Sequence, residues 1–167
     1  MKKLLIDLII SANAILLLVL FTTKVFAFDG VVTKVHDGDT LTAINELGFG
    51  EKIRLARADA PELKAFKWGE QPYAQEARNA LVSLCEGKTA TIIRKAKDQY
   101  GRTVASISCQ STDVAAYMIK NGDAWAYRYS STKALRSLQA NAKSQHLGLW
   151  ALENPVEPIV WRKKALH

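Results

Sequence analysis

The feature that most constrains the fold of this chain is a set of five short runs rich in β-branched and apolar residues. The runs are residues 31–35, 40–44, 52–58, 89–96 and 102–109. The first two are separated by His36-Asp37-Gly38-Asp39, and the last two by Asp98-Gln99-Tyr100-Gly101, and both segments favour tight turns. The pattern predicts five short strands, four of which are joined in pairs by turns.

Three helices are predicted around these strands, at residues 70–86, 113–120 and 131–148. In the first, apolar residues recur at spacings of three and four, and Gly87 stands where a helix would end. Asp113 can cap the second helix, and Ser131 or Thr132 can cap the third. Five short strands with a helix inserted after the third predict an α+β fold: a five-stranded, OB-type Greek-key β-barrel with three helices.

The start of the chain has the order of a secretory signal peptide. Lys2 and Lys3 precede an apolar run over residues 8–21, and the segment ends in the small residue Ala27. We expect residues 1–27 to be a signal peptide cleaved after Ala27, and the protein to be periplasmic or secreted. The alternative is a membrane anchor formed by an uncleaved segment. The apolar run is, however, shorter than a bilayer-spanning helix, which needs about 20 residues.

The remaining residues, 28–167, are expected to form one domain, because no repeat or linker interrupts them. Pro155 and Pro158 lead us to expect an irregular tail from about residue 151. The formal net charge of the whole chain is +7 at pH 7. A basic domain is attracted to polyanions such as nucleic acid, but charge alone does not identify a nuclease.

Cys85 and Cys109 are the only two cysteines of the chain. Because an even number of cysteines in an exported protein favours pairing, we predict a disulfide between them. It would tie the end of the first predicted helix to the fifth strand. The alternative is two unpaired thiols.

Three acidic residues stand at the ends of predicted strands: Asp39, Asp59 and Glu62. Carboxylates from different strand ends, together with backbone carbonyls and water, suit a hard cation such as Ca²⁺. The alternative is that the segments are simple turns, and for either segment taken singly this is the preferred interpretation, because Asp, Gly and Pro are common in turns.

Two arginines are candidates for binding a phosphate. Arg54 lies between Ile53 and Leu55, and strand alternation places its side chain opposite its apolar neighbours. Arg102 follows the turn at residues 98–101. Two guanidinium groups near a cation would bind a phosphate and neutralise the charge that grows on its oxygens. Taken singly, an arginine in a strand more often lies on a solvated face or forms a surface salt bridge.

Four segments together resemble the signature segments of the staphylococcal nuclease (thermonuclease) family, in the same order and at similar spacing. They are residues 35–41, 53–62, 98–102 and 122–129. The resemblance extends over residues 30–150. It implies a Ca²⁺-dependent phosphodiesterase that hydrolyses DNA or RNA and leaves 3′-phosphate ends.

The resemblance also implies a metal site. Asp39 and Asp59 match the calcium-binding aspartates of the family, and the backbone carbonyl of Ala60 matches the third protein ligand. Two positions depart from the family pattern. Ala60 replaces a threonine whose side chain is not the ligand, and Gln99 replaces a lysine near the phosphates of the nucleotide.

Catalytic and substrate-binding roles follow from the same resemblance. Glu62 matches the proposed general base, and Arg54 and Arg102 match the two phosphate-binding arginines. Tyr127 and Tyr129 match tyrosines that contact the nucleotide.

The expected partner is therefore a DNA or RNA substrate. The sequence implies no stable protein partner, so a monomer is expected, and membrane association would require the signal peptide to stay uncleaved. The main alternative function is a non-catalytic OB-fold module that binds nucleic acid without cutting it. The presence of the complete acidic and arginine set favours the enzyme.

Overall fold

The computed structural model describes residues 27–64 and 69–164. The predicted signal peptide, apart from Ala27, lies outside these residues. Among the helices of the described part, none has the length and apolar character needed to cross a bilayer.

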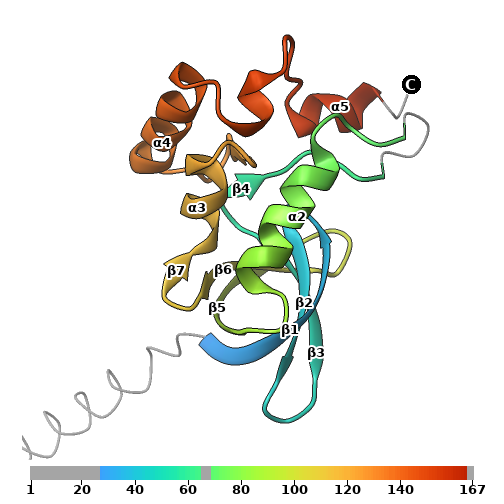
Figure 1. Cartoon of the computed structure of the whole chain (residues 1–167). Coiled ribbons are helices and arrows are strands. Elements are labelled where there is room, and N and C mark those ends of the chain that lie inside the picture. Colours follow the sequence, from blue (N-terminus) through green and yellow to red (C-terminus); the bar gives the residue numbers. More distant parts are fainter. Residues whose placement is uncertain (1–26, 65–68, 165–167) are drawn as a thin grey trace, which may run out of the picture.

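A five-stranded barrel forms the centre of the structure (Figure 1). Its strands are β1 (Ala27–Asp37), β2 (Thr40–Asn45), β3 (Gly50–Leu55), β5 (Thr89–Lys97) and β6 (Thr103–Cys109). Antiparallel pairing gives the order β3-β2-β1-β5-β6, and a parallel pairing of β3 with β6 closes the barrel. The predicted OB-type barrel is confirmed.

Alternation and strand curvature explain why these segments close into a barrel. Along β6 the residues Thr103, Ala105, Ile107 and Cys109 are buried, while the residues between them are half-buried. Irregular pairing interrupts the register of β1 with β2 at two points. Such irregularities bend a strand and increase its twist, which closure of a small barrel requires.

Three short strands extend this sheet or pair beside it. β7 (Thr112–Asp113) continues from the edge at β6, and β4 (Ala58–Asp59) pairs with β8 (Trp125–Ala126). The predicted third strand, residues 52–58, is therefore divided into β3 and β4. The division lets the chain leave the barrel after Leu55 and carries Asp59 toward β8.

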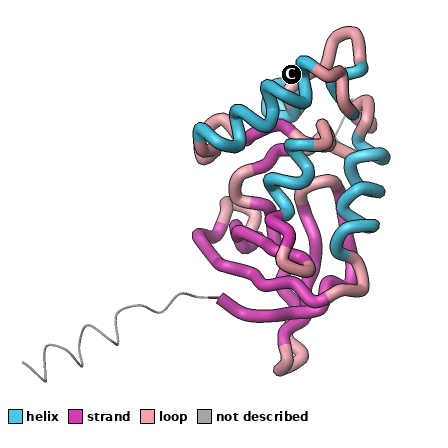
Figure 2. Tube along the Cα trace, turned by 60° about the vertical axis from the view of Figure 1, so that its left-hand side comes forward, coloured by secondary structure: helices cyan, strands magenta, loops and turns pink. Residues whose placement is uncertain are grey.

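Four α-helices and one 3₁₀ helix occur in the described ranges. They are α2 (Ala74–Cys85), α3 (Val114–Lys120), α4 (Lys133–Ser144), η1 (Gly148–Ala151) and α5 (Pro158–Lys164). Helix α2 packs along the barrel, while α3, α4 and α5 lie at the end opposite the turn between β2 and β3 (Figures 1 and 2). The predicted caps are present: Asp113 accepts a hydrogen bond from Ala116 N, and Thr132 accepts one from Leu135 N.

Three helix predictions need correction. The third predicted helix, residues 131–148, ends at Ser144, because His146 adopts a left-handed backbone conformation with φ of 52°, and Gly148 begins η1 instead. Helix α2 begins at Ala74 rather than at residue 70, because Tyr73 adopts a left-handed backbone conformation with φ of 72°. The tail is irregular only over residues 152–157, because α5 begins at Pro158 and adds a fourth helix to the three predicted. Proline was interpreted as a helix breaker, although its fixed φ and missing N–H are well suited to the first helical position.

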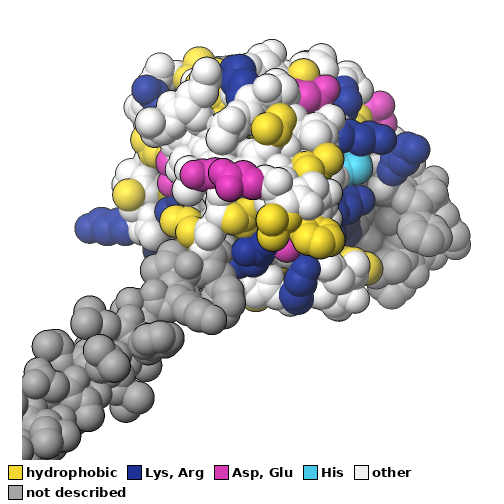
Figure 3. All heavy atoms as spheres, turned by 90° about the horizontal axis from the view of Figure 1, so that it is seen from below, with side chains coloured by type: hydrophobic (Ala, Val, Ile, Leu, Met, Phe, Trp, Pro, Cys, Tyr) yellow, Lys and Arg dark blue, Asp and Glu magenta, His cyan; other side chains and the backbone are white. Residues whose placement is uncertain are grey.

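The other end of the barrel carries exposed apolar side chains. Figure 3 views the molecule from below and shows apolar side chains gathered among charged ones. In the turn between β2 and β3, Leu47 and Phe49 are both exposed. The buried apolar core joins inward-facing residues of the barrel strands to α2 and α3.

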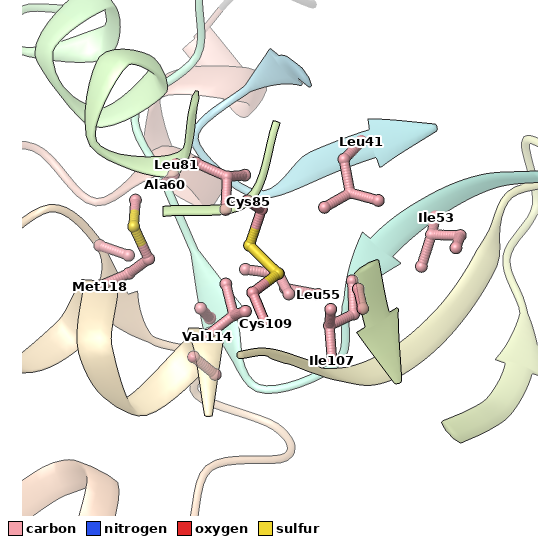
Figure 4. Close-up of a cluster of buried hydrophobic side chains, with 14 of the residues drawn as sticks. Leu41, Ile53, Leu55, Ala60, Leu81, Cys85, Ile107, Cys109, Val114 and Met118 are labelled. Atoms are coloured by element: carbon pink, nitrogen blue, oxygen red, sulfur yellow. A yellow bond between two sulfur atoms is a disulfide. The ribbon is translucent and has the colours of Figure 1, made fainter. Parts of the chain in front are cut away.

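The predicted disulfide is present in the structure, and it joins Cys85 at the end of α2 to Cys109 at the end of β6. Figure 4 shows it inside the apolar core beside Leu55, Ile107 and Val114. Both cysteines are fully buried. The bond thus fixes α2 against the barrel wall.

We expect the double substitution Cys85→Ala with Cys109→Ala to lower the free energy of unfolding by about 3 kcal/mol, the value expected for a closed loop of this size. The two residues are 24 positions apart. Urea denaturation of the oxidised protein, the reduced protein and the double variant measures the effect. Equal midpoints for the oxidised and reduced proteins would contradict it.

Candidate active site

The three predicted carboxylates lie together at one end of the barrel. Asp39 precedes β2, Asp59 ends β4, and Glu62 follows in the next loop. Asp39 and Asp59 are buried, whereas the side chain of Glu62 is partly exposed. Burial of two carboxylates so close together requires compensating donors, because removing each charge from water is unfavourable by several kcal/mol.

Gly38 allows the turn before Asp39 to approach the rest of the site. A Cβ atom on Gly38 would lie 2.7 Å from Cβ of Ala60 and 2.9 Å from Cβ of Ala77. These distances are too short for any larger residue without movement of the neighbouring chain. The close approach lets the backbone N–H of Ala60 donate a hydrogen bond to Asp39 Oδ2 at 3.1 Å.

Arg54 bridges the two buried aspartates. The pairing of β2 with β3 sets Arg54 opposite Thr40, the neighbour of Asp39. Arg54 Nη2 lies 3.0 Å from Asp39 Oδ2 and also forms an ion pair with Asp59 Oδ1. One nitrogen atom thus contacts both carboxylates, so their oxygens surround a common point.

Arg102 reaches the same group from the residue just before β6. Its Nε donates to Asp98 Oδ2 at 2.7 Å, and its Nη1 donates to Thr40 Oγ1 at 3.4 Å. The Thr40 hydroxyl in turn donates to Asp39 Oδ1 at 2.9 Å. Arg102 is therefore separated from Asp39 by a single hydroxyl group.

The two predicted tyrosines lie beside Arg54. The Arg54 guanidinium lies 5.5 Å from the centre of the Tyr127 ring. Tyr127 and Tyr129 are in edge-to-face contact with 5.5 Å between ring centres. Tyr129 is exposed, so the pair offers an aromatic surface that begins beside Arg54 and ends in solvent.

Arg162, on α5, joins the site although the sequence analysis missed it. Its Nη1 and Nη2 lie 3.0 Å from Oδ1 and Oδ2 of Asp59, and its Nη1 also contacts Glu62 Oε1. Residues 161–164 read Trp-Arg-Lys-Lys, a basic run that gives no sign of a site contact. The sequence signal that could have indicated this helix is Pro158, because proline is well suited to the first position of a helix.

Burial and mutual repulsion disfavour the ionised forms of several carboxyls. Burial, followed by the charge of Asp39, raises the pKa of Asp37 to about 7. The same two causes raise the pKa of Asp59 and of Glu62. Asp37 was not singled out from the sequence. The result is a concentration of negative charge that additional positive charge would stabilise.

The chemistry of the donors fits a hard cation. Asp39 and Asp59 supply neighbouring carboxylate oxygens beside Arg54, and no sulfur or imidazole ligand is involved. Across residues 27–64 and 69–164, no group of three acidic, His or Cys side chains forms a ready-made metal site. The ligand set for Ca²⁺ would therefore consist of the two aspartates with backbone oxygen and water.

Comparison with known proteins agrees with this geometry. Residues 52–152 match the model of the family described as staphylococcal nuclease homologue. A Haemophilus influenzae protein named uncharacterized endonuclease is 39% identical over 134 residues, which cover 80% of this chain and 72% of the relative. An endonuclease of the same printed name from Escherichia coli O157:H7 is 34% identical, over 89% of this chain and 95% of the relative. The staphylococcal-like nuclease CAN1 of Arabidopsis thaliana is 37% identical over 67% of this chain and 33% of its own length.

We expect Gly38→Ala to lower the free energy of unfolding by about 1–3 kcal/mol, because the added methyl group must displace Ala60 or Ala77. Urea denaturation measures the loss. Gly50→Ala is the control, since its Cβ would meet only ordinary contacts of 3.7 and 3.9 Å. A loss no larger at Gly38 than at Gly50 would contradict the proposed close approach.

Proposed function

Since the chain belongs to the staphylococcal nuclease family, we propose that it is a Ca²⁺-dependent endonuclease that hydrolyses phosphodiester bonds in DNA or RNA and leaves 3′-phosphate ends. One observation carries the proposal. Two buried aspartates, Asp39 and Asp59, share a contact with Arg54, while Glu62 and Arg102 lie beside them. Phosphodiester hydrolysis needs positive charge at the phosphate, a base for water, and donors for the transition state.

Asp39, Asp59 and the backbone carbonyl of Ala60 would hold the calcium ion. When bound there, Ca²⁺ supplies positive charge that polarises the phosphodiester. The protein's own contribution is to fix the two carboxylates: Thr40 and the Ala60 N–H hold Asp39, and strand pairing with Trp125 holds Asp59.

Glu62 is the proposed general base. Its backbone is fixed at both ends by Gln71, whose N–H donates to Glu62 O at 2.8 Å and whose Oε1 accepts from Glu62 N at 3.1 Å. Its carboxylate is partly exposed and thus accessible to water. A base must be ionised to accept a proton, and the guanidinium of Arg162 favours that form.

Arg54 and Arg102 are proposed to bind the phosphate and stabilise charge in the transition state. Both lie within contact of the Asp39–Thr40 pair, so one phosphate group can reach both guanidinium groups. Tyr127 and Tyr129 would stack against a base or sugar next to that phosphate, as aromatic residues do in single-strand binding.

The second candidate function is a binding module of the OB type, favoured by the open aromatic surface at Tyr127 and Tyr129. Binding alone would not require Glu62 or a cation. Cleavage assays with calcium and with a chelator therefore distinguish the two functions.

We expect Glu62→Gln and Arg102→Ala to lower the rate of single-stranded DNA cleavage by about a hundredfold or more, because they remove a proton acceptor and a transition-state donor. Asp39→Ala should mainly raise the calcium concentration that cleavage requires. Steady-state cleavage at a series of calcium concentrations gives both quantities, and circular dichroism checks the fold.

The matched controls for these variants are Glu46→Gln and Lys133→Ala, which remove the same charges at exposed positions. Both should cleave at the wild-type rate. Wild-type protein that cuts equally fast in a chelator would contradict the calcium site. Wild-type protein that binds DNA but never cuts it would favour the binding module.

We also propose that residues 1–27 are a signal peptide and that the protein acts in the periplasm or outside the cell. Ala27 is the first residue of β1, so cleavage after it would leave Phe28 to begin the domain. Phe28 packs against the core and lies 4.1 Å from the Arg94 guanidinium. N-terminal sequencing of exported protein should therefore begin at Phe28. A sequence beginning at Met1 would favour the membrane anchor instead.

A further inference from the structure

We propose that Arg162 on α5 is an internal competitor of the divalent cation: it neutralises Asp59 in the absence of the cation and must leave that carboxylate when the cation binds. The inference rests on the proposed function, because it takes Asp59 to be a cation ligand. It goes beyond that function by assigning the C-terminal helix a part in setting cation affinity.

The contacts of Asp59 show why the two must compete. Arg162 contacts both of its carboxylate oxygens at 3.0 Å, and Arg54 contacts Oδ1 as well. The side chain of Asp59 is only 1% exposed, so no oxygen is left open to solvent. Calcium binds carboxylate oxygens at about 2.3–2.6 Å, within the space that the guanidinium fills.

Arg162 is the arginine that can move. The Arg54 side chain is 12% exposed and extends from the barrel, where it also contacts Asp39. The Arg162 side chain is 36% exposed and comes from a helix on the outside of the molecule. A rotation of this side chain toward solvent frees Oδ2 of Asp59 and leaves Arg54 as the one arginine at Oδ1, without any change in the barrel.

Helix α5 does not depend on Arg162 for its position. Gln71 Nε2 donates to Val156 O at 2.7 Å just before the helix, and Glu157 forms an ion pair with Arg128. Trp161 faces an apolar hollow that Trp125 also lines. The exchange is therefore a movement of one side chain, and the helix remains docked.

The charges around Asp59 explain why Arg162 occupies this position at all. Asp59 shares the Arg54 contact with Asp39, and Arg162 donates hydrogen bonds to both Asp59 and Glu62. Without a cation or Arg162, two carboxylates would face Asp39 with only Arg54 between them. Arg162 thus stabilises the same charges that the cation would otherwise stabilise.

Calcium titration by isothermal calorimetry, without nucleic acid, tests the inference on the wild type, Arg162→Gln, Arg162→Lys and Lys163→Gln. Arg162→Gln should bind calcium roughly tenfold more tightly, the change expected when one charge-assisted contact no longer competes. Lys163 is exposed on the same helix, so Lys163→Gln removes an equal charge and should change the Kd by less than about twofold. Arg162→Lys keeps the charge without the paired contacts, so its Kd for calcium should lie between those of Arg162→Gln and Lys163→Gln.

Thermal denaturation supplies a second readout that does not depend on catalysis. In a chelator, Arg162→Gln should melt below the wild type, and saturating calcium should remove the difference. If Arg162→Gln does not fold in a chelator, the calorimetric comparison of Arg162→Lys with the wild type decides the question.

A variant at Arg162 that binds calcium no more tightly than Lys163→Gln would overturn the competition while leaving the calcium-dependent nuclease intact. Wild-type protein that binds no calcium would overturn the proposed cation site and the competition together. The two failures are therefore distinguishable in one set of titrations.

Discussion

The structure of the site depends on the burial of two neighbouring carboxylates, Asp39 and Asp59. Such an arrangement is unfavourable unless each charge is paired and hydrogen-bonded. The Ala60 N–H, the Thr40 hydroxyl and the Arg54 guanidinium supply the required donors. Each donor comes from a different local structure, so the site exists only when the barrel, the turn at Gly38 and the loop after β4 are all in place.

Barrel closure is what brings the two proposed phosphate-binding arginines together. In the parallel pairing of β3 with β6, Ile53 is opposite Thr103 and Arg54 is opposite Val104. Arg102, one residue before Thr103, therefore lies at the same edge of the barrel as Arg54. An open sheet with the same strands would leave β3 and β6 at opposite edges, and the arginines would lie far apart.

Local signals made much of this predictable from the sequence. The β-branched runs and turn residues were sufficient for the five strands, and Asp39, Asp59 and Glu62 stood at recognisable strand ends. The contact between Arg102 and Thr40 was not predictable from their spacing in the sequence, because it depends on closure of the barrel. Arg162 was missed for a stronger reason, since its partner Asp59 lies 103 residues away and α5 is too short to show a clear period.

The arginine side chains of the site affect the protein both without and with a bound cation. Four carboxyls lie close together, those of Asp37, Asp39, Asp59 and Glu62, and the side chains of Arg54 and Arg162 contact three of them. A site of fixed, unpaired carboxylates would bind a cation tightly but would destabilise the fold without one. In the proposed competition, pairing with arginine would remove that instability and would weaken cation binding by the same interaction. In a calcium-dependent nuclease this balance would make cation affinity a property of the C-terminal helix as well as of the aspartates.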